Sequence, residues 1–167
     1  MALTMKSILF AVLSLTILSG CSGIAAISQP PSDSEIQAAI KINSPIAISA
    51  VFGDRNIADG IDVMITYQNI ESKAIKYVEF ELVLVNAVGD VVATNIMNKK
   101  RTHLQSTGPV KSGSTKWADW KAPVYHSDAV KLAILSADIT YMDGTKEKAP
   151  GLAAMPSAHG VIENKRY

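Results

Sequence analysis

Hydrophobic and polar residues alternate along much of the chain between residues 46 and 142, with the two-residue period of β-strands that bury one face. The clearest strands are residues 61–68 and residues 76–85. The positions predicted to face the core are Ile61, Val63, Ile65 and Tyr67 in the first strand and Val78, Phe80, Leu82 and Leu84 in the second.

Two further strands are predicted with the same unbroken period. In residues 46–52 the period places Ile46, Ile48, Ala50 and Phe52 on one face. In residues 130–142 it places Ala133, Leu135, Ala137, Ile139 and Tyr141 on one face, and Leu132, Ile134, Ser136 and Asp138 on the other.

Turn residues separate these strands. The stretch NAVGD at 86–90 predicts a hairpin that joins residues 76–86 to residues 90–97, and Asp143-Gly144 predicts a second hairpin turn. The loop GPVKSG at 108–113 precedes the segment that carries both tryptophans. About seven short strands with little helix predict an all-β fold, an antiparallel immunoglobulin-like β-sandwich over residues 45–148.

The segments on either side of this domain have a different composition. Residues 22–34 are small, polar and proline-containing, which is typical of a flexible tether. A short helix is expected within the tether region 21–44, because Ser32 and Glu35 have the spacing of a capping box. Residues 149–167 show no periodicity and are expected to form an ordered or partly disordered tail.

An apolar run occupies residues 7–19, with Lys6 just before it. Its 13 residues are too few to span a bilayer, which takes about 20. The run instead matches the hydrophobic region of a signal peptide, so residues 1–20 are expected to be removed.

The end of this run carries the only cysteine of the chain, in the order Leu18-Ser19-Gly20-Cys21. These residues resemble the lipobox of bacterial lipoproteins. The resemblance covers four residues and lies at the end of the hydrophobic region, where a lipobox is expected. It implies cleavage before Cys21, acylation of its sulfur and new amine, and anchoring in the cell envelope, since two or more acyl chains hold a protein stably on a membrane. Ser22, in place of aspartate, implies sorting to the outer membrane on its periplasmic side. The alternative is an ordinary buried cysteine.

Cleavage before Cys21 would leave 147 of the 167 residues, enough for one domain with its own core. Lys6 is the only charged residue removed, so 15 basic and 15 acidic side chains remain. This balance argues against a nucleic-acid partner. With Cys21 lipidated, no thiol remains for a disulfide.

A second resemblance concerns the domain itself. The stretches FELVLVNAVGDVV at 80–92, GPVKSG at 108–113 and ADITYMDG at 137–144 resemble the FxLYD-type, immunoglobulin-like modules of bacterial envelope proteins. The resemblance covers residues 46–148 loosely and departs from the pattern at Asn86, where an aspartate is usual. It implies the sandwich fold and no assigned activity.

Residues that could carry catalysis or bind a metal do not form a recognisable pattern. His126, Ser127 and Asp128 are adjacent, and neighbouring residues of an extended chain point to opposite faces, so a polar turn is expected. The acidic loop 54–62 lacks the glycine and glutamate positions of an EF-hand; another calcium geometry stays open beside a plain turn. The three histidines, His103, His126 and His159, lack zinc spacing. No cofactor, metal site or catalytic residue is predicted.

The best candidates for recognition are Trp117, Trp120 and Tyr125. Two residues three apart in a strand face opposite ways, so one tryptophan could fill the core while the other lies exposed with Asp119, ready to stack on a sugar or peptide. The alternative is that both are packed. The basic run 99–101 could contact anionic lipid headgroups or could simply protect a hairpin edge.

These observations favour a non-enzymatic, membrane-anchored envelope lipoprotein, an immunoglobulin-like interaction module that contacts another envelope protein. The alternative is a lipoprotein that binds a glycan or peptide through an exposed aromatic patch. An enzyme is the third hypothesis and has no catalytic motif behind it.

Overall fold

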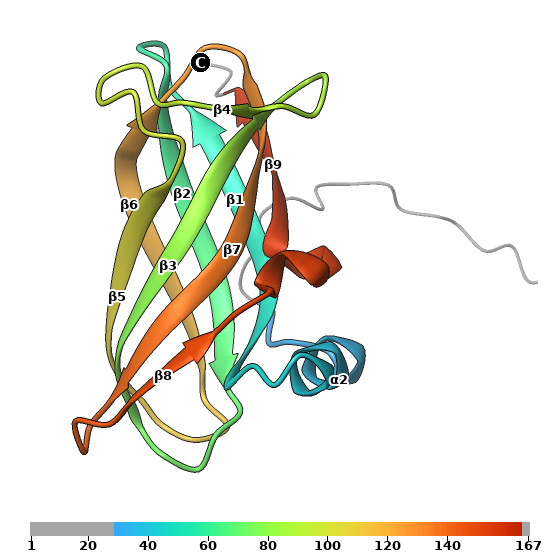
Figure 1. Ribbon diagram of the computed structural model, residues 1–167, viewed down its shortest axis with the longest axis vertical. Helices are drawn as coiled ribbons and strands as arrows, with labels where there is room; N and C mark the ends of the chain where they lie inside the picture. The colour runs from blue at the N-terminus through green and yellow to red at the C-terminus, as the bar shows by residue number, and fades with distance from the viewer. Residues whose placement is uncertain (1–28, 165–167) are drawn as a thin grey trace, which may run out of the picture.

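The predicted strands form a β-rich fold built on one curled sheet (Figure 1). The computed structural model describes residues 29–164. The predicted signal peptide, Cys21 and the first tether residues lie outside them. The strands are β1 (Ile46–Arg55), β2 (Gly60–Asn69), β3 (Ile75–Asn86), β4 (Val91–Val92), β5 (Thr102–Val110), β6 (Thr115–Tyr125), β7 (Ala129–Tyr141), β8 (Lys146–Ala149) and β9 (His159–Asn164).

The sheet has two halves that face each other. Antiparallel pairing joins β1, β2 and β6 into one half, here called the β2 half. Antiparallel pairing also joins β4, β5 and β7 to β3, and β8 to β7, in the β3 half. In Figure 1 the β3 half lies in front of the β2 half.

Strand β9 joins the two halves along one side. It pairs antiparallel with β7 and parallel with β1. The sheet is therefore mixed, and the prediction of a purely antiparallel arrangement is wrong at the β1–β9 pair. The segment 149–167, expected as a tail, supplies this strand after two short 3-10 helices, Leu152–Ala154 and Pro156–Ala158.

Two β-bulges interrupt strands that were predicted with an unbroken period. In β7 the register skips Leu135, so Leu132 and Ile134 lie in the core together with Ile139. In β1 the register skips Ser49. An extra residue in a strand reverses the side on which all later residues point. The prediction of one unbroken face in each of these strands is therefore wrong. Leu135, Ala50 and Phe52 are only partly buried, and after Ser49 it is Val51 that is buried in β1.

The core between the two halves is centred on Phe80 of β3, which has no exposed surface. Its ring packs edge-on against Tyr67 of β2 at 5.3 Å between ring centroids, and against Trp120 of β6 at 6.3 Å. The predicted core faces of β2 and β3 are confirmed, because all eight of their members are buried. The hydroxyl of Tyr67 lies 2.9 Å from the hydroxyl of Ser106 on β5, a buried hydrogen bond between the halves.

Both predicted hairpins are present. The first joins β3 to β4, but β4 has only two residues, so the second strand is shorter than the predicted 90–97. The side chain of Asn86 closes this turn by accepting hydrogen bonds from the main-chain N–H groups of Val88 and Asp90. The second joins β7 to β8, with Gly144 at a φ of 84°, a value that glycine adopts readily.

Helix α2 (Asp33–Lys41) begins with the predicted capping box. Ser32 accepts from the main chain of Glu35, and Glu35 accepts from the main chain of Ser32 at 2.7 Å. The helix buries Ala39 against the core, so this part of the tether region belongs to the folded domain. Within residues 29–164, no helix has the length and apolar character required to cross a membrane.

Candidate binding site

The edges of β5 and β6 face each other across a line that we call the seam. No ladder of main-chain hydrogen bonds pairs these two strands within residues 29–164. Two side chains of β6 bridge them instead. The indole N–H of Trp120 donates to the Gln105 carbonyl at 3.1 Å, and the ammonium of Lys116 donates to the Thr107 carbonyl at 2.5 Å. These bonds satisfy two carbonyls of β5, which helps to protect an edge that could otherwise pair with another chain.

The two tryptophans lie on opposite faces of β6, as their spacing predicts. Trp120 points inward onto Phe80, whereas Trp117 is 53% exposed and Asp119 is exposed on the same side. Both tryptophans border a shallow hollow of about 280 Å³ that also includes polar residues of β5. The seam thus presents one exposed indole ring on a nearly flat surface.

An irregular stretch of β6 follows Trp120. Ala122 has a φ of 44°, and its N–H donates to the Asp62 carboxylate at 2.9 Å. The ammonium of Lys121 lies 3.2 Å from the same carboxylate. Asp62, which sequence analysis placed at the end of an acidic loop, therefore fixes the course of β6 towards Tyr125.

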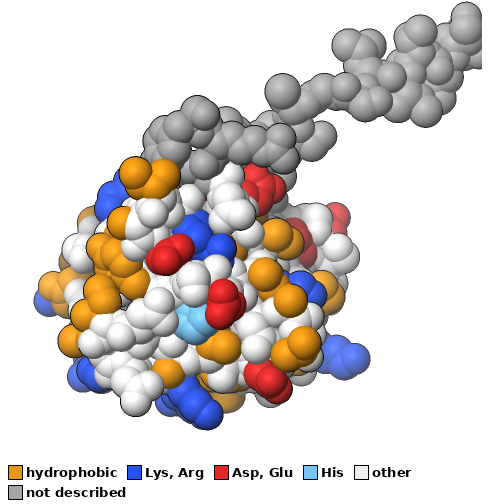
Figure 2. All heavy atoms as spheres, turned by 90° about the horizontal axis from the view of Figure 1, so that it is seen from above, with side chains coloured by type: hydrophobic (Ala, Val, Ile, Leu, Met, Phe, Trp, Pro, Cys, Tyr) orange, Lys and Arg blue, Asp and Glu red, His pale blue; other side chains and the backbone are white. Residues whose placement is uncertain are grey.

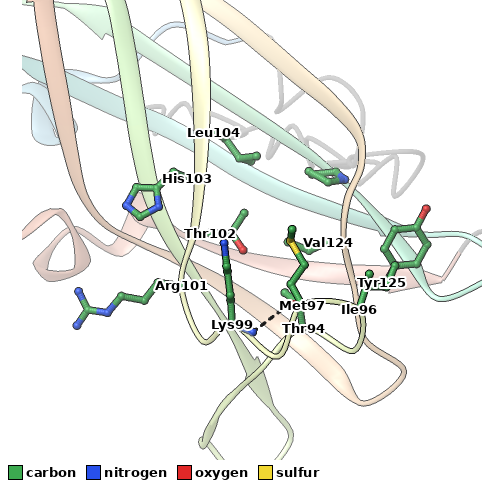
Figure 3. Close-up of a pocket in the computed structure, with 11 residues that line it drawn as sticks. Thr94, Ile96, Met97, Lys99, Arg101, Thr102, His103, Leu104, Val124 and Tyr125 are labelled. Carbon is green, nitrogen blue, oxygen red and sulfur yellow. Dashed lines mark hydrogen bonds between the residues drawn. The ribbon is translucent and has the colours of Figure 1, made fainter.

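Beyond this point the seam opens into a groove. The groove lies at one end of the domain, which we call the tip and which is formed by residues 56–59, 87–90, 93–101 and 126–128. Figure 2 looks onto this end and shows hydrophobic, basic and acidic side chains sharing it. The groove has a volume of about 510 Å³, and Leu104 and Val124 form its buried apolar floor. Figure 3 shows Arg101 and Tyr125 on opposite sides of the groove with Met97 between them.

The three predicted aromatic residues therefore do not form one patch. Trp117 and Trp120 border the hollow, whereas Tyr125 borders the groove. Ile96 and Met97 of the groove were not identified from the sequence as recognition residues, although their exposed fractions are 69% and 68%. They fall in a segment that was predicted as strand, whose alternation would have buried one of them.

The basic run at the tip is partly engaged in an ion pair. Arg101 donates to the Glu81 carboxylate at 2.7 Å. This hydrogen bond is the main reason that the pKa of Glu81 is lowered, and a second hydrogen bond from Ser136 acts in the same direction. Lys99 borders the groove, and Lys100 lies exposed beside it.

The adjacent residues His126, Ser127 and Asp128 form the expected polar bend between β6 and β7. The main-chain N–H of Asp128 donates to His126 Nδ1 at 3.0 Å, and the Ser127 hydroxyl donates to the Asp128 carboxylate at 3.1 Å. The serine hydroxyl thus bonds the carboxylate and not the imidazole, which is not the order of a hydrolase triad. Within the described part of the chain, the three histidines belong to no cluster of three or more metal-ligating side chains.

The acidic loop between β1 and β2 contains the expected side-chain turn. Asn56 Oδ1 accepts hydrogen bonds from the N–H groups of Ala58 and Gly60, at 2.9 and 3.0 Å. Asp59 has a φ of 60°, a conformation that Asp tolerates better than most residues. These contacts form the Asx-type turn that was one of the two expectations for this loop.

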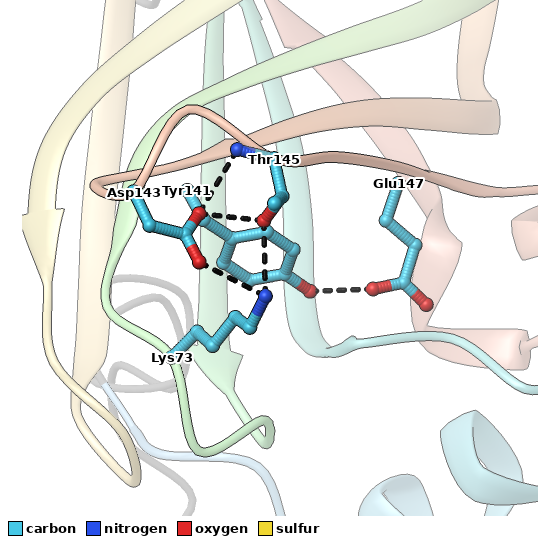
Figure 4. A network of polar contacts seen from close by, with 5 residues as sticks. All are labelled: Lys73, Tyr141, Asp143, Thr145 and Glu147. Atoms are coloured by element: carbon cyan, nitrogen blue, oxygen red, sulfur yellow. Dashed lines mark hydrogen bonds and ion pairs between the residues drawn. The ribbon is translucent and has the colours of Figure 1, made fainter.

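The end of the domain opposite the tip carries a polar network (Figure 4). Asp143 accepts from the Thr145 hydroxyl at 2.6 Å and lies 2.9 Å from the Lys73 ammonium. These contacts lower the pKa of Asp143 from 3.8 to about 2. The Tyr141 hydroxyl donates to Glu147 at 2.6 Å, and burial together with this carboxylate raises the pKa of the phenol. The network fixes the β7–β8 hairpin, and its Glu147 also borders a groove of about 550 Å³ that is lined by residues of β3, β5, β7 and β8.

No protein-family model matches the sequence, and no curated protein matches it. Among solved structures, the chain is similar to the X-ray structure of Northeast Structural Genomics Consortium target SoR45, with 13% sequence identity and a TM-score of 0.32. The similarity covers 55% of this chain and 64% of that chain, so it spans less than two thirds of the other protein. A likeness at this TM-score does not define a shared fold.

Proposed function

We propose that this protein is a lipid-anchored, non-enzymatic interaction module of the bacterial cell envelope. In this proposal Cys21 carries the lipid, and the outer face of β6 around Trp117 contacts another envelope protein. The observation that carries the proposal is the exposed indole of Trp117 on an otherwise folded surface, because tryptophan is enriched among the residues that dominate protein interfaces.

The shape of this surface favours a protein partner over a small ligand. Clefts that enclose small molecules measure about 300–1,000 Å³. The hollow beside Trp117 measures about 280 Å³ and is shallow. A flat surface with one aromatic anchor suits another protein surface better than a sugar or a short peptide.

The order of the strands supports an immunoglobulin-like fold for the module. β1, β2 and β6 occupy the places of strands A, B and E, and β3, β7 and β9 those of C, F and G. β5 pairs with β3, whereas the corresponding strand of a constant-type domain pairs with strand E. The seam is thus the place where β5 pairs with β3 and not with β6, the strand in the position of E.

The anchor is tested by fractionating cells that express the wild-type chain or Cys21→Ser. We expect the wild-type protein in the membrane fraction and the variant in the soluble envelope fraction, because the variant cannot be acylated. Mass spectrometry of the membrane form should show acyl chains on residue 21. A variant that still fractionates with membranes would overturn the anchor.

The contact surface is tested by placing a photo-crosslinking amino acid at position 117 in intact cells. The matched control is position 161 on β9, because Val161 is 58% exposed and lies away from the seam. We expect one protein to be captured from position 117 and not from position 161, and its purified form to lose binding to Trp117→Ala. Identical capture from both positions would contradict the proposal.

A glycan or peptide ligand is the second candidate, and the groove beside Tyr125 is the observation that favours it. Its volume of about 510 Å³ lies within the range of ligand clefts. Titration with glycan fragments or short peptides, followed by NMR of the Leu104 and Val124 methyl groups, would detect such a ligand. An unchanged spectrum across the panel would exclude the tested compounds.

A further inference from the structure

We propose that the tip docks on the anionic surface of the bilayer that holds the Cys21 anchor. Ile96 and Met97 enter the interfacial layer, and Lys99 and Lys100 contact the lipid headgroups. This proposal rests on the lipid anchor proposed above. It would orient the domain with its long axis towards the membrane and leave the face around Trp117 accessible from the side.

The apolar side chains at the tip are held outward by an ordered turn. The N–H of Thr94 donates to the Lys99 carbonyl at 2.9 Å, and the N–H of Asn98 donates to the Thr94 carbonyl at 2.8 Å. The N–H of Asn95 donates to the Tyr125 carbonyl at 2.9 Å, which ties the turn to β6. The turn between these bonds holds two long apolar side chains next to each other in solvent. Exposed apolar residues grouped in this way mark surfaces that meet a protein or a membrane.

The charges next to these residues favour an anionic surface. Residues 91–101 contain three basic side chains and no acidic one. Arg101 is paired with Glu81, whereas Lys99 and Lys100 form no ion pair within residues 29–164. The acidic residues of the tip lie on other loops, at Asp59, Asp90 and Asp128. The electrostatic attraction to an anionic surface is therefore confined to the loop 93–101, which also carries Ile96 and Met97.

The length of the chain before the domain permits this contact. Gln29 is held to β1 by a hydrogen bond from Ser49 to its carbonyl at 2.9 Å. Gln29 follows Cys21 by eight residue-to-residue steps, which at about 3.3–3.6 Å each span at most about 29 Å. From Ser49 to the end of β1 at Arg55 the strand rises about 20 Å. The tip thus lies within reach of the membrane that the anchor would occupy.

The opposite end is less suited to a membrane. Its β7–β8 hairpin loop exposes Met142, beside the neutralised pair of Lys73 and Asp143. Among residues 29–164, this hairpin loop does not place two exposed long apolar side chains next to unpaired lysines. Both ends lie within the length of the tether, so the side chains decide which end faces the bilayer.

The test uses the acylated protein in vesicles, with a thiol-reactive environment-sensitive dye. Cys21 is the only cysteine, and acylation blocks it, so Met97→Cys introduces a single reactive thiol. Met142→Cys is the matched control at the opposite end, where the exposed fraction is similar at 55%. The vesicles contain either phosphatidylcholine alone or phosphatidylcholine with phosphatidylglycerol.

We expect the dye at position 97 to shift to the blue and to be shielded from acrylamide in the phosphatidylglycerol vesicles, with neither effect at position 142. Adding Lys99→Gln and Lys100→Gln should lower the ratio of docked to undocked protein by about 25-fold, because each basic residue near an anionic membrane contributes about fivefold.

Each other outcome overturns a defined part of the proposal. Protein that does not float with the vesicles would overturn the anchor and the docking together. Protein that floats while the dye at position 97 stays as exposed as at position 142 would overturn the docking alone. An equal shift in neutral vesicles would overturn the role of the lysines. A shift that appears only after a soluble envelope protein is added would assign the tip to a protein partner instead.

Discussion

Tyr67 and Ser106 should contribute to folding stability in an energetically coupled way, because the hydrogen bond between them is buried and joins the two halves of the sheet. Tyr67 has no exposed surface, and Ser106 is 4% exposed. Burial raises the pKa of the Tyr67 phenol, which therefore remains protonated well above neutral pH. Tyr67→Phe removes one hydroxyl, retains the ring contact with Phe80, and leaves the serine hydroxyl without its buried partner.

The cost of each single substitution follows from that orphaned hydroxyl. A buried polar group that loses its partner costs about 1–3 kcal/mol. Tyr67→Phe and Ser106→Ala should each lower the free energy of unfolding by about this amount. The double variant removes both hydroxyls, and replacing both partners by apolar groups can be nearly neutral. Its loss should therefore be smaller than the sum of the two single losses, by a coupling of at least about 1 kcal/mol.

Urea unfolding followed by tryptophan fluorescence measures the free energy of unfolding of the wild type, the two single variants and the double variant. A matched control pairs Tyr67→Phe with Ser127→Ala, a hydroxyl in the exposed bend between β6 and β7. That control pair should be additive within about 0.5 kcal/mol. Additive losses in the Tyr67–Ser106 pair would refute the reasoning, because they would mean that neither hydroxyl depends on the other.

Three further predictions concern other parts of the fold. Gly160→Ala should lower the urea midpoint strongly, because a Cβ atom there would collide with the main-chain carbonyl oxygen of Val51 in β1. An unchanged midpoint would contradict the close approach of β9 to β1. In an NMR titration the carboxyl of Asp143 should show a pKa of about 2, and Lys73→Met should raise this pKa. Because the pKa is depressed in the folded state, the contribution of Asp143 to folding stability is present above about pH 4 and is lost as the pH falls towards 2. A titration midpoint at the ordinary 3.8 would exclude the network. Ser32→Ala should cost about 1 kcal/mol through loss of the helix cap, and no change in unfolding free energy would show that α2 does not depend on it.

The sequence predicts local structure well where one principle decides the outcome. The cap at Ser32 and Glu35 and the turn at Gly144 depend on a few neighbouring residues, and both are confirmed. The opposite orientations of Trp117 and Trp120 follow from the strand period alone, and the structure confirms them. These features need no information about distant parts of the chain.

The errors arise where distant parts of the chain decide. The bulges at Ser49 and Leu135 insert one residue each, and alternation cannot reveal them because both faces of these strands carry apolar residues. Strand β9 was missed because only a short stretch of it pairs with each neighbour, too few residues to show a period. The groove was not predicted because Met97 and Tyr125 are distant in the sequence and line the same groove only in the folded domain, where β5 and β6 separate.

The position of β9 has a consequence for how the chain folds and is made. Gly53 and Ile162, which pair across β1 and β9, are separated by more than 100 residues, and contacts between such distant residues slow folding. Until β9 is present, the edge of β1 and the stretch Lys131–Ala133 of β7, which β8 does not cover, are open to pairing with other chains. A chain truncated before Leu152 would keep the residues of its groove, its seam and its proposed anchor, yet would leave β1 and part of β7 with unpaired edges. The C-terminal segment thus acts as the closing strand that separates a finished domain from an aggregation-prone one.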